Sequence, residues 1–113
     1  MNIEDYEKIA MSTLIDNHDY GDISSQLLAQ VLGLVGESGE VAEKFKKLIR
    51  DKKGIISEED RAEIIKELGD ILWYITSVSN LLGSSLADVA QKNNQKLLSR
   101  KSRDKISGAG DNR

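Results

Sequence analysis

Four stretches of this chain repeat their apolar side chains every three or four residues, and no proline interrupts any of them. That spacing places the apolar side chains on one side of an α-helix, whereas a half-buried strand alternates them every second residue. Clusters of Gly, Ser, Asn and Asp separate the four stretches, as is typical of connecting loops. The sequence therefore predicts an all-α fold, a four-helix bundle.

Capping signals set the expected ends of these helices. Ser57 and Ser85 are each followed by an Asp three residues later, a spacing that resembles a capping box. Gly54 and Gly83 are typical stop signals, since glycine adopts the left-handed conformation that ends many helices. The expected helices run from 3 to 15, from an N-cap at Asp22 or Ser24 to about Lys52, from about 58 to Leu82, and from about 86 to Arg100.

The remaining residues, 101–113, form a basic and then Gly-rich C-terminal tail that we expect to be flexible. Residues 1–100 are expected to form a single all-α domain. A domain of this size buries only a modest core, so assembly into a homo-oligomer would add to its stability.

The charge, hydropathy and cysteine content of the chain argue against several classes of function. The formal net charge of -3 argues against a chain that binds a nucleic acid polymer, because such binding needs an excess of Lys and Arg. The longest apolar runs are far shorter than the roughly 20 residues of a membrane span. The absence of Cys excludes a disulfide framework and is consistent with a reducing compartment. We therefore expect a cytoplasmic protein with no membrane partner.

Two acidic pairs point to a chemistry: Glu37 with Glu40 in the second expected helix, and Glu67 with Asp70 in the third. Residues three apart lie about 60° apart around a helix axis, so each pair presents two carboxylates to the same neighbour. If the two helices pack through their apolar sides, all four carboxylates meet at one border of the buried face. Such a cluster is repulsive unless a cation compensates it, and Mg²⁺, with Mn²⁺ as a possible substitute, prefers oxygen ligands. Zinc is disfavoured because the chain has one His and no Cys.

An ordinary solvated helix face is the alternative explanation for these acids in a chain that is 31% charged. Four glycines inside the same helices favour the metal site, because each costs about 1 kcal/mol there and is expected where a close approach matters. Glu63 is a reserve candidate ligand, whereas Glu43 is expected to be solvated. The four glycines are Gly33, Gly36, Gly39 and Gly69.

Six further side chains are candidates for holding a phosphorylated substrate. Cationic and amide groups suit phosphate oxygens and base edges, and an aromatic ring suits a nucleobase pocket. Solvated faces and ordinary ion pairs are the alternative for each cation. The candidates are Lys44 and Lys47 beside the first acidic pair, Tyr74 beside the second, and Asn93, Lys96 and Arg100 on one face of the fourth helix. Trp73 is expected in a core or interface, and His18 in a loop, as a structural or exposed residue.

Three segments together resemble the MazG-like nucleoside triphosphate pyrophosphohydrolases of the all-α superfamily. They are Gly33–Glu43, Lys66–Tyr74 and Asn93–Arg100, with the acidic E-x-x-E and E-x-x-D pairs as the family pattern. The resemblance implies hydrolysis of a (d)NTP to a (d)NMP and pyrophosphate, with Mg²⁺ held by Glu37, Glu40, Glu67 and Asp70. It also implies a homodimer or homotetramer, and nucleotide contacts from Tyr74, Asn93 and Lys96.

Glu37 and Glu40 are our first candidates for a catalytic base. Two other functions stay open at this point: a catalytically silent helical oligomerisation or regulatory module, and a dUTPase-like member of the same superfamily. The sequence does not choose among nucleotides, between one metal ion and two, or between dimer and tetramer. The ending Gly108–Arg113 departs from the aromatic-rich ending that is frequent in the family.

Overall fold

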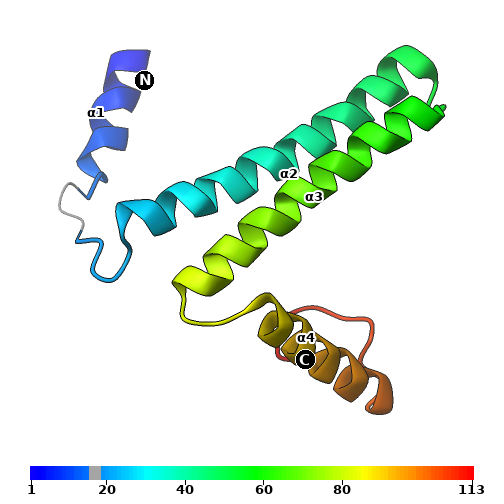
Figure 1. Cartoon of the computed structure of the whole chain (residues 1–113). Helices are drawn as coiled ribbons and strands as arrows, with labels where there is room; N and C mark the ends of the chain where they lie inside the picture. The colour runs from blue at the N-terminus through cyan, green and yellow to red at the C-terminus, as the bar shows by residue number, and fades with distance from the viewer. Residues whose placement is uncertain (16–18) are drawn as a thin grey trace.

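The computed structural model describes residues 1–15 and 19–113, and it confirms the all-α prediction: no strand occurs in these ranges. His18 lies outside the described residues. Four helices follow one another along the chain (Figure 1). They are α1 (Ile3–Ser12), α2 (Ser25–Lys52), α3 (Glu58–Leu81) and α4 (Leu86–Ser102).

The ends of α2 and α3 agree with the capping signals. Ser24 caps α2, where its Oγ accepts a hydrogen bond from the Leu27 N–H at 3.0 Å. Lys53 and Gly54 end the same helix with φ values of 54° and 77°. Before α3, Ser57 and Asp60 form the complete capping box, each side chain accepting from the backbone N–H of the other. The turn between the two helices is therefore set by local chemistry at both ends.

Two of the expected boundaries and one expected capping box were wrong in detail. Helix α1 ends at Ser12 rather than at residue 15, where the Ser12 and Thr13 hydroxyls donate to carbonyls three residues back and compete with the next helical turn. Helix α4 continues to Ser102, two residues beyond its predicted end. Its N-cap at Ser85 forms, but the Asp88 carboxylate accepts from Ser84 Oγ at 2.6 Å, so the reciprocal half of the capping box is missing.

Helices α2 and α3 form a long antiparallel hairpin, and α4 packs against α3 beyond its open end (Figure 1). These are the two helix pairs in contact within the described ranges. The buried apolar side chains are Leu27, Leu48 and Ile64, all from the hairpin. Several other apolar side chains of the two helices, including Ile49 and Ile65, are exposed in the single chain. The α2–α3 hairpin is thus the rigid part that positions any site.

The chain is open as a monomer. Its radius of gyration is 20.2 Å, whereas a compact domain of about 100 residues has a radius near 13 Å. The described helices include none long and apolar enough to cross a membrane. The expected homo-oligomer would supply the missing packing partners, and it stays a prediction.

Candidate functional site

Three carboxylates meet at the middle of the hairpin. Glu37 comes from α2, and Glu67 and Asp70 come from α3. One oxygen of each lies within 4.8 Å of one oxygen of the other two. Glu37 and Glu67 are half-buried, and Asp70 is exposed. The side chains of the two helices therefore converge as the helical projection predicted, with three of the four expected ligands in one group.

Two contacts nearer the open end of the hairpin set how α2 and α3 are aligned along their length. Ser77 Oγ donates to Gln30 Oε1 at 2.9 Å, and the ring of Tyr74 lies where a Cβ on Gly33 would be. Moving one helical turn toward the hairpin loop from these contacts brings Glu37 opposite the second acidic pair. Gly33 therefore permits the close approach expected of it, while the other three helical glycines have no atom within 4 Å of an added Cβ.

The three carboxylates repel one another, and no positive charge in the group compensates them. The hydrogen bond that a protonated Glu37 can make to Glu67 is the main reason that the pKa of Glu37 rises from 4.5 to about 7; burial and the charges of Glu40, Glu67 and Asp70 raise it further. Oε2 of Glu37 and Oε2 of Glu67 are buried and have no hydrogen-bond donor among the described residues. Buried carboxylate oxygens without a donor are costly, and a hard divalent cation is the ligand that such oxygens fit. The donor set suits Mg²⁺ or Mn²⁺.

Glu40 stands apart from the group of three. Its side chain is exposed one turn away from Glu37, although its charge is close enough to raise the pKa of Glu37. A fourth ligand at Glu40 thus stays a prediction. The reserve candidate Glu63 forms an ion pair with Lys66 at 3.2 Å on the surface of α3.

Lys44 and Lys47 line a cavity of about 320 Å³ between α2 and α3, next to the carboxylates on the side of the hairpin loop. The other residues of its wall are Leu48, Asp51, Lys52, Asp60, Glu63 and Ile64. The wall carries three lysines, three acidic side chains and two apolar ones. Lys52 is paired with Asp60, so Lys44 and Lys47 are the two lysines of this wall that have no ion pair among the described residues.

Tyr74 is half-buried on the other side of the carboxylates, and its ring meets the Trp73 ring edge to face at 5.1 Å. Trp73 itself is 60% exposed. The tryptophan has no described partner other than Tyr74's ring, so an interface role for it stays a prediction.

The three candidates on α4 form a second group. Asn93 and Lys96 line a cavity of about 390 Å³ together with Val89 and Lys92. Arg100 is buried, one turn beyond Lys96. Because α4 lies beyond the open end of the hairpin, a single chain does not bring this group onto the carboxylates (Figure 1).

Sequence reasoning missed Asp111, which contacts two of the four cations of α4. Its Oδ1 accepts from Lys96 Nζ at 2.6 Å and from Arg100 Nη2 at 3.2 Å. No periodic pattern marks this residue, because it follows the glycines of a tail that has another acid at Asp104. The tail is therefore held along α4 rather than projecting freely from it.

Comparison with known proteins decides the family. The model of the MazG nucleotide pyrophosphohydrolase domain matches residues 25–103. The chain belongs to this family. The MazG chain is also 44% identical to the Gene 37 protein of Mycobacterium phage L5, over 115 aligned residues that cover all of both chains. No solved structure matches it.

The family match begins at the first residue of α2 and ends just beyond α4. It includes the three convergent carboxylates and both groups of candidate substrate residues. In this MazG domain the hairpin supplies the acidic site, while α1 and most of the tail lie outside the matched segment.

Proposed function

We propose that this protein is a Mg²⁺-dependent nucleoside triphosphate pyrophosphohydrolase, which hydrolyses a (d)NTP to the (d)NMP and pyrophosphate. The observation that carries the proposal is the convergence of Glu37, Glu67 and Asp70 in a MazG domain, with buried oxygens that lack a hydrogen-bond partner. Phosphoryl transfer depends mainly on positioning and on neutralising charge, which such a site can provide.

Glu37, Glu67 and Asp70 are the residues that would hold the cation, and Mn²⁺ could replace Mg²⁺. When bound, a divalent cation supplies positive charge to the phosphoryl oxygens and acidifies water. Glu40 is the best-placed free carboxylate beside this group. It would accept the proton of the attacking water, since its side chain is exposed and it is not one of the three convergent residues that would hold the cation.

The cations of the hairpin would hold the phosphates. Lys44 and Lys47 line the cavity next to the carboxylates, where their ammonium groups can contact phosphate oxygens. Tyr74 lies on the opposite side and would line the nucleobase pocket with its ring. In this arrangement the scissile bond would lie between the two, at the carboxylates.

The residues of α4 would reach the nucleotide from a second copy of the chain. Asn93, Lys96 and Arg100 are separated from the carboxylates in one chain, and the open hairpin leaves apolar faces for another chain to cover. A homodimer or homotetramer would bring the two groups together.

A pyrophosphate-release assay tests the proposal, using all ribo- and deoxyribonucleoside triphosphates with and without Mg²⁺. We expect Mg²⁺-dependent release from at least one triphosphate, and a loss of roughly 100-fold or more in Glu67→Gln, because removing a ligand impairs metal binding and charge stabilisation together. Glu43→Gln is the matched control, since Glu43 is exposed and pairs only with Lys46, at 3.7 Å.

Folded protein that releases no pyrophosphate from any of the triphosphates would favour the silent helical module instead. Release from dUTP alone would identify a dUTPase-like member of the superfamily. Equal activity in the Glu67→Gln and Glu43→Gln variants would remove the carboxylate group from the mechanism.

A further inference from the structure

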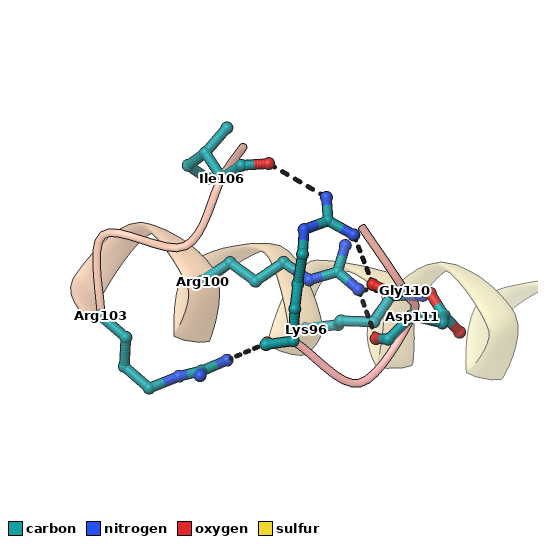
Figure 2. A network of polar contacts seen from close by, with 7 residues as sticks. Lys96, Arg100, Arg103, Ile106, Gly110 and Asp111 are labelled. Carbon is teal, nitrogen blue, oxygen red and sulfur yellow. Dashed lines mark hydrogen bonds and ion pairs between the residues drawn. The ribbon is translucent and has the colours of Figure 1, made fainter. Parts of the chain in front are cut away.

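The tail returns along α4 (Figure 2), where Arg100 and Arg103 hold it to the helix and Arg113 bonds within the tail itself. Arg100 Nη2 donates to the backbone carbonyl of Asp111 as well as to its carboxylate. Arg103 Nη2 donates to the Arg113 carbonyl at 2.9 Å. Arg113 in turn donates to the carbonyls of Gly110 at 2.6 Å and Ile106 at 3.0 Å. The last eight residues are thus a closed loop tied to one face of the helix.

Glycines allow the chain to turn back in this way. Gly108 and Gly110 have φ values of 126° and 87°, which side chains other than glycine rarely adopt. A Cβ at Gly108 would also approach Arg113 Cδ at 3.2 Å. The glycines that predicted a flexible tail therefore allow the chain to make the specific turn that returns it along α4.

Asp111 is the charge that joins this loop to the candidate substrate residues. Its carboxylate bridges Lys96 and Arg100, and these two cations keep the pKa of Asp111 below its ordinary value. Lys96 also lines the 390 Å³ cavity beside Asn93. One internal carboxylate therefore occupies Lys96, which lines the cavity, together with Arg100 one helical turn further along α4.

We infer that the tail is a strap, latched by Asp111 onto Lys96 and Arg100, and that a polyphosphate group opens it by taking the place of the Asp111 carboxylate. The inference rests on the proposed function, because it uses the α4 residues as part of the nucleotide site. It assigns to Asp111 the role of a resident counter-ion.

Arg100 is held more firmly than its partner Asp111, so another anion can replace the Asp111 carboxylate while the guanidinium stays in place. Arg100 is only 6% exposed, so its guanidinium is held in place. The Asp111 side chain is 77% exposed, so its ion pairs are solvated and weak. A polyphosphate brings several negative charges and can bind the guanidinium through two oxygens, which a single exposed carboxylate cannot match.

Binding of inorganic tripolyphosphate to the full-length protein, measured by calorimetry without divalent cations, tests the latch. We expect Asp111→Asn to bind tripolyphosphate several-fold more tightly than the unchanged protein, because the competing carboxylate is gone. Asp104→Asn is the matched control: it removes the same charge from the same tail, where Asp104 makes no ion pair within the described residues. Its affinity should stay close to that of the unchanged protein.

Tryptic cleavage gives a second readout, independent of affinity. Lys105 is exposed, but its N–H is bonded to the Arg100 carbonyl at 2.7 Å. Tripolyphosphate should speed cleavage after Lys105 in the unchanged protein, since a released tail can enter the protease as an extended chain. Gly110→Ala, which strains the turn without changing charge, should show fast cleavage even without tripolyphosphate. Pyrophosphate and a nucleoside monophosphate, tested in parallel, show whether the leaving group or the retained phosphate opens the strap.

Weaker or unchanged binding in Asp111→Asn would overturn the latch, and so would tripolyphosphate that protects the tail from trypsin. Absence of tripolyphosphate binding in every variant would overturn it as well. None of these results depends on turnover, so the pyrophosphohydrolase activity can stand if the strap fails. Conversely, tripolyphosphate can open the strap in a protein that hydrolyses nothing.

Discussion

Glu37 combines a buried, partnerless oxygen with a pKa of about 7, against 4.5 in an unfolded chain. Between these two pH values the folded protein holds a proton that the unfolded chain has lost, so the free energy of unfolding falls as the pH rises through this window. Without divalent cations, we expect the melting temperature to decrease from pH 5 to pH 8. Glu37→Gln should flatten that decrease, whereas the exposed Glu43→Gln should keep it. A melting temperature that rises over this range in the unchanged protein would contradict the prediction.

The same proton competes with a cation for Glu37. Mg²⁺ needs deprotonated carboxylates, so its stabilisation of the folded protein should grow as Glu37 loses its proton. We expect the rise in melting temperature on adding Mg²⁺ to be larger at pH 8 than at pH 5.5, and EDTA to reverse it. Asp70→Asn should reduce the rise at both pH values. An equal rise in the Asp70→Asn variant would show that Mg²⁺ binds elsewhere.

The candidate residues themselves were predictable to different degrees. Glu67 and Asp70 share a helix face because they are three residues apart, and the apolar sides of the two helices predicted that Glu37 would meet them. The position of Glu40 could not be predicted, because its distance from the group depends on the axial rotation of α2 against α3. The contact of Asp111 with Lys96 was also out of reach, since it depends on the path of a Gly-rich loop that no periodic pattern describes.

At the scale of elements, the approach of α3 to α2 depends on a missing side chain. A methyl group at Gly33 would overlap the Tyr74 ring, whereas one at Gly36 would meet no atom within 4 Å. We expect Gly33→Ala to lower the free energy of unfolding by about 1–3 kcal/mol through overpacking. Gly36→Ala should raise it by up to about 1 kcal/mol, because alanine is the better helix former. Urea denaturation measures both, and similar values for the two variants would argue against the Tyr74 contact.

Helix boundaries were predictable where side chains cap the backbone. Ser57 fixed the start of α3 to the residue, and Ser24 was one of two candidates for the start of α2, because such a hydroxyl accepts a specific backbone N–H. The end of α1 was harder to predict, since the hydrogen bonds made by the Ser12 and Thr13 hydroxyls compete only weakly with another helical turn. At α4 the Asp88 carboxylate had two possible donors, and sequence spacing does not distinguish Ser84 from the cap itself.

For the whole molecule, surface area argues that one chain is incomplete. The accessible surface is 9286 Å², whereas a compact monomer of 12.5 kDa exposes about 6,200 Å². The excess has the size of an obligate interface between subunits. The sequence was enough to predict the fold class, a helical bundle. It could not predict which helices of the bundle come from the same chain and which from another copy, because an apolar face can be covered by either.

The exposed apolar face of α3 allows this last expectation to be tested. Ile65, Leu68 and Leu72 are 60%, 50% and 50% exposed and lie at the spacing of one helix face. We expect the unchanged protein to sediment as a dimer or tetramer at micromolar concentration, and the double variant Leu68→Lys, Leu72→Lys to sediment as smaller species, since each buried ammonium would lack a partner.

Ile106→Lys is the control for that variant, because Ile106 is equally exposed but lies on the tail, outside the helical face. It should leave the assembly intact. If α4 of one copy completes the nucleotide site of another, the dissociated double variant should also lose pyrophosphate release, while keeping the helical content of its hairpin. An unchanged protein that sediments as a monomer, yet releases pyrophosphate, would show that a single chain closes its own site by moving α4 toward the carboxylates.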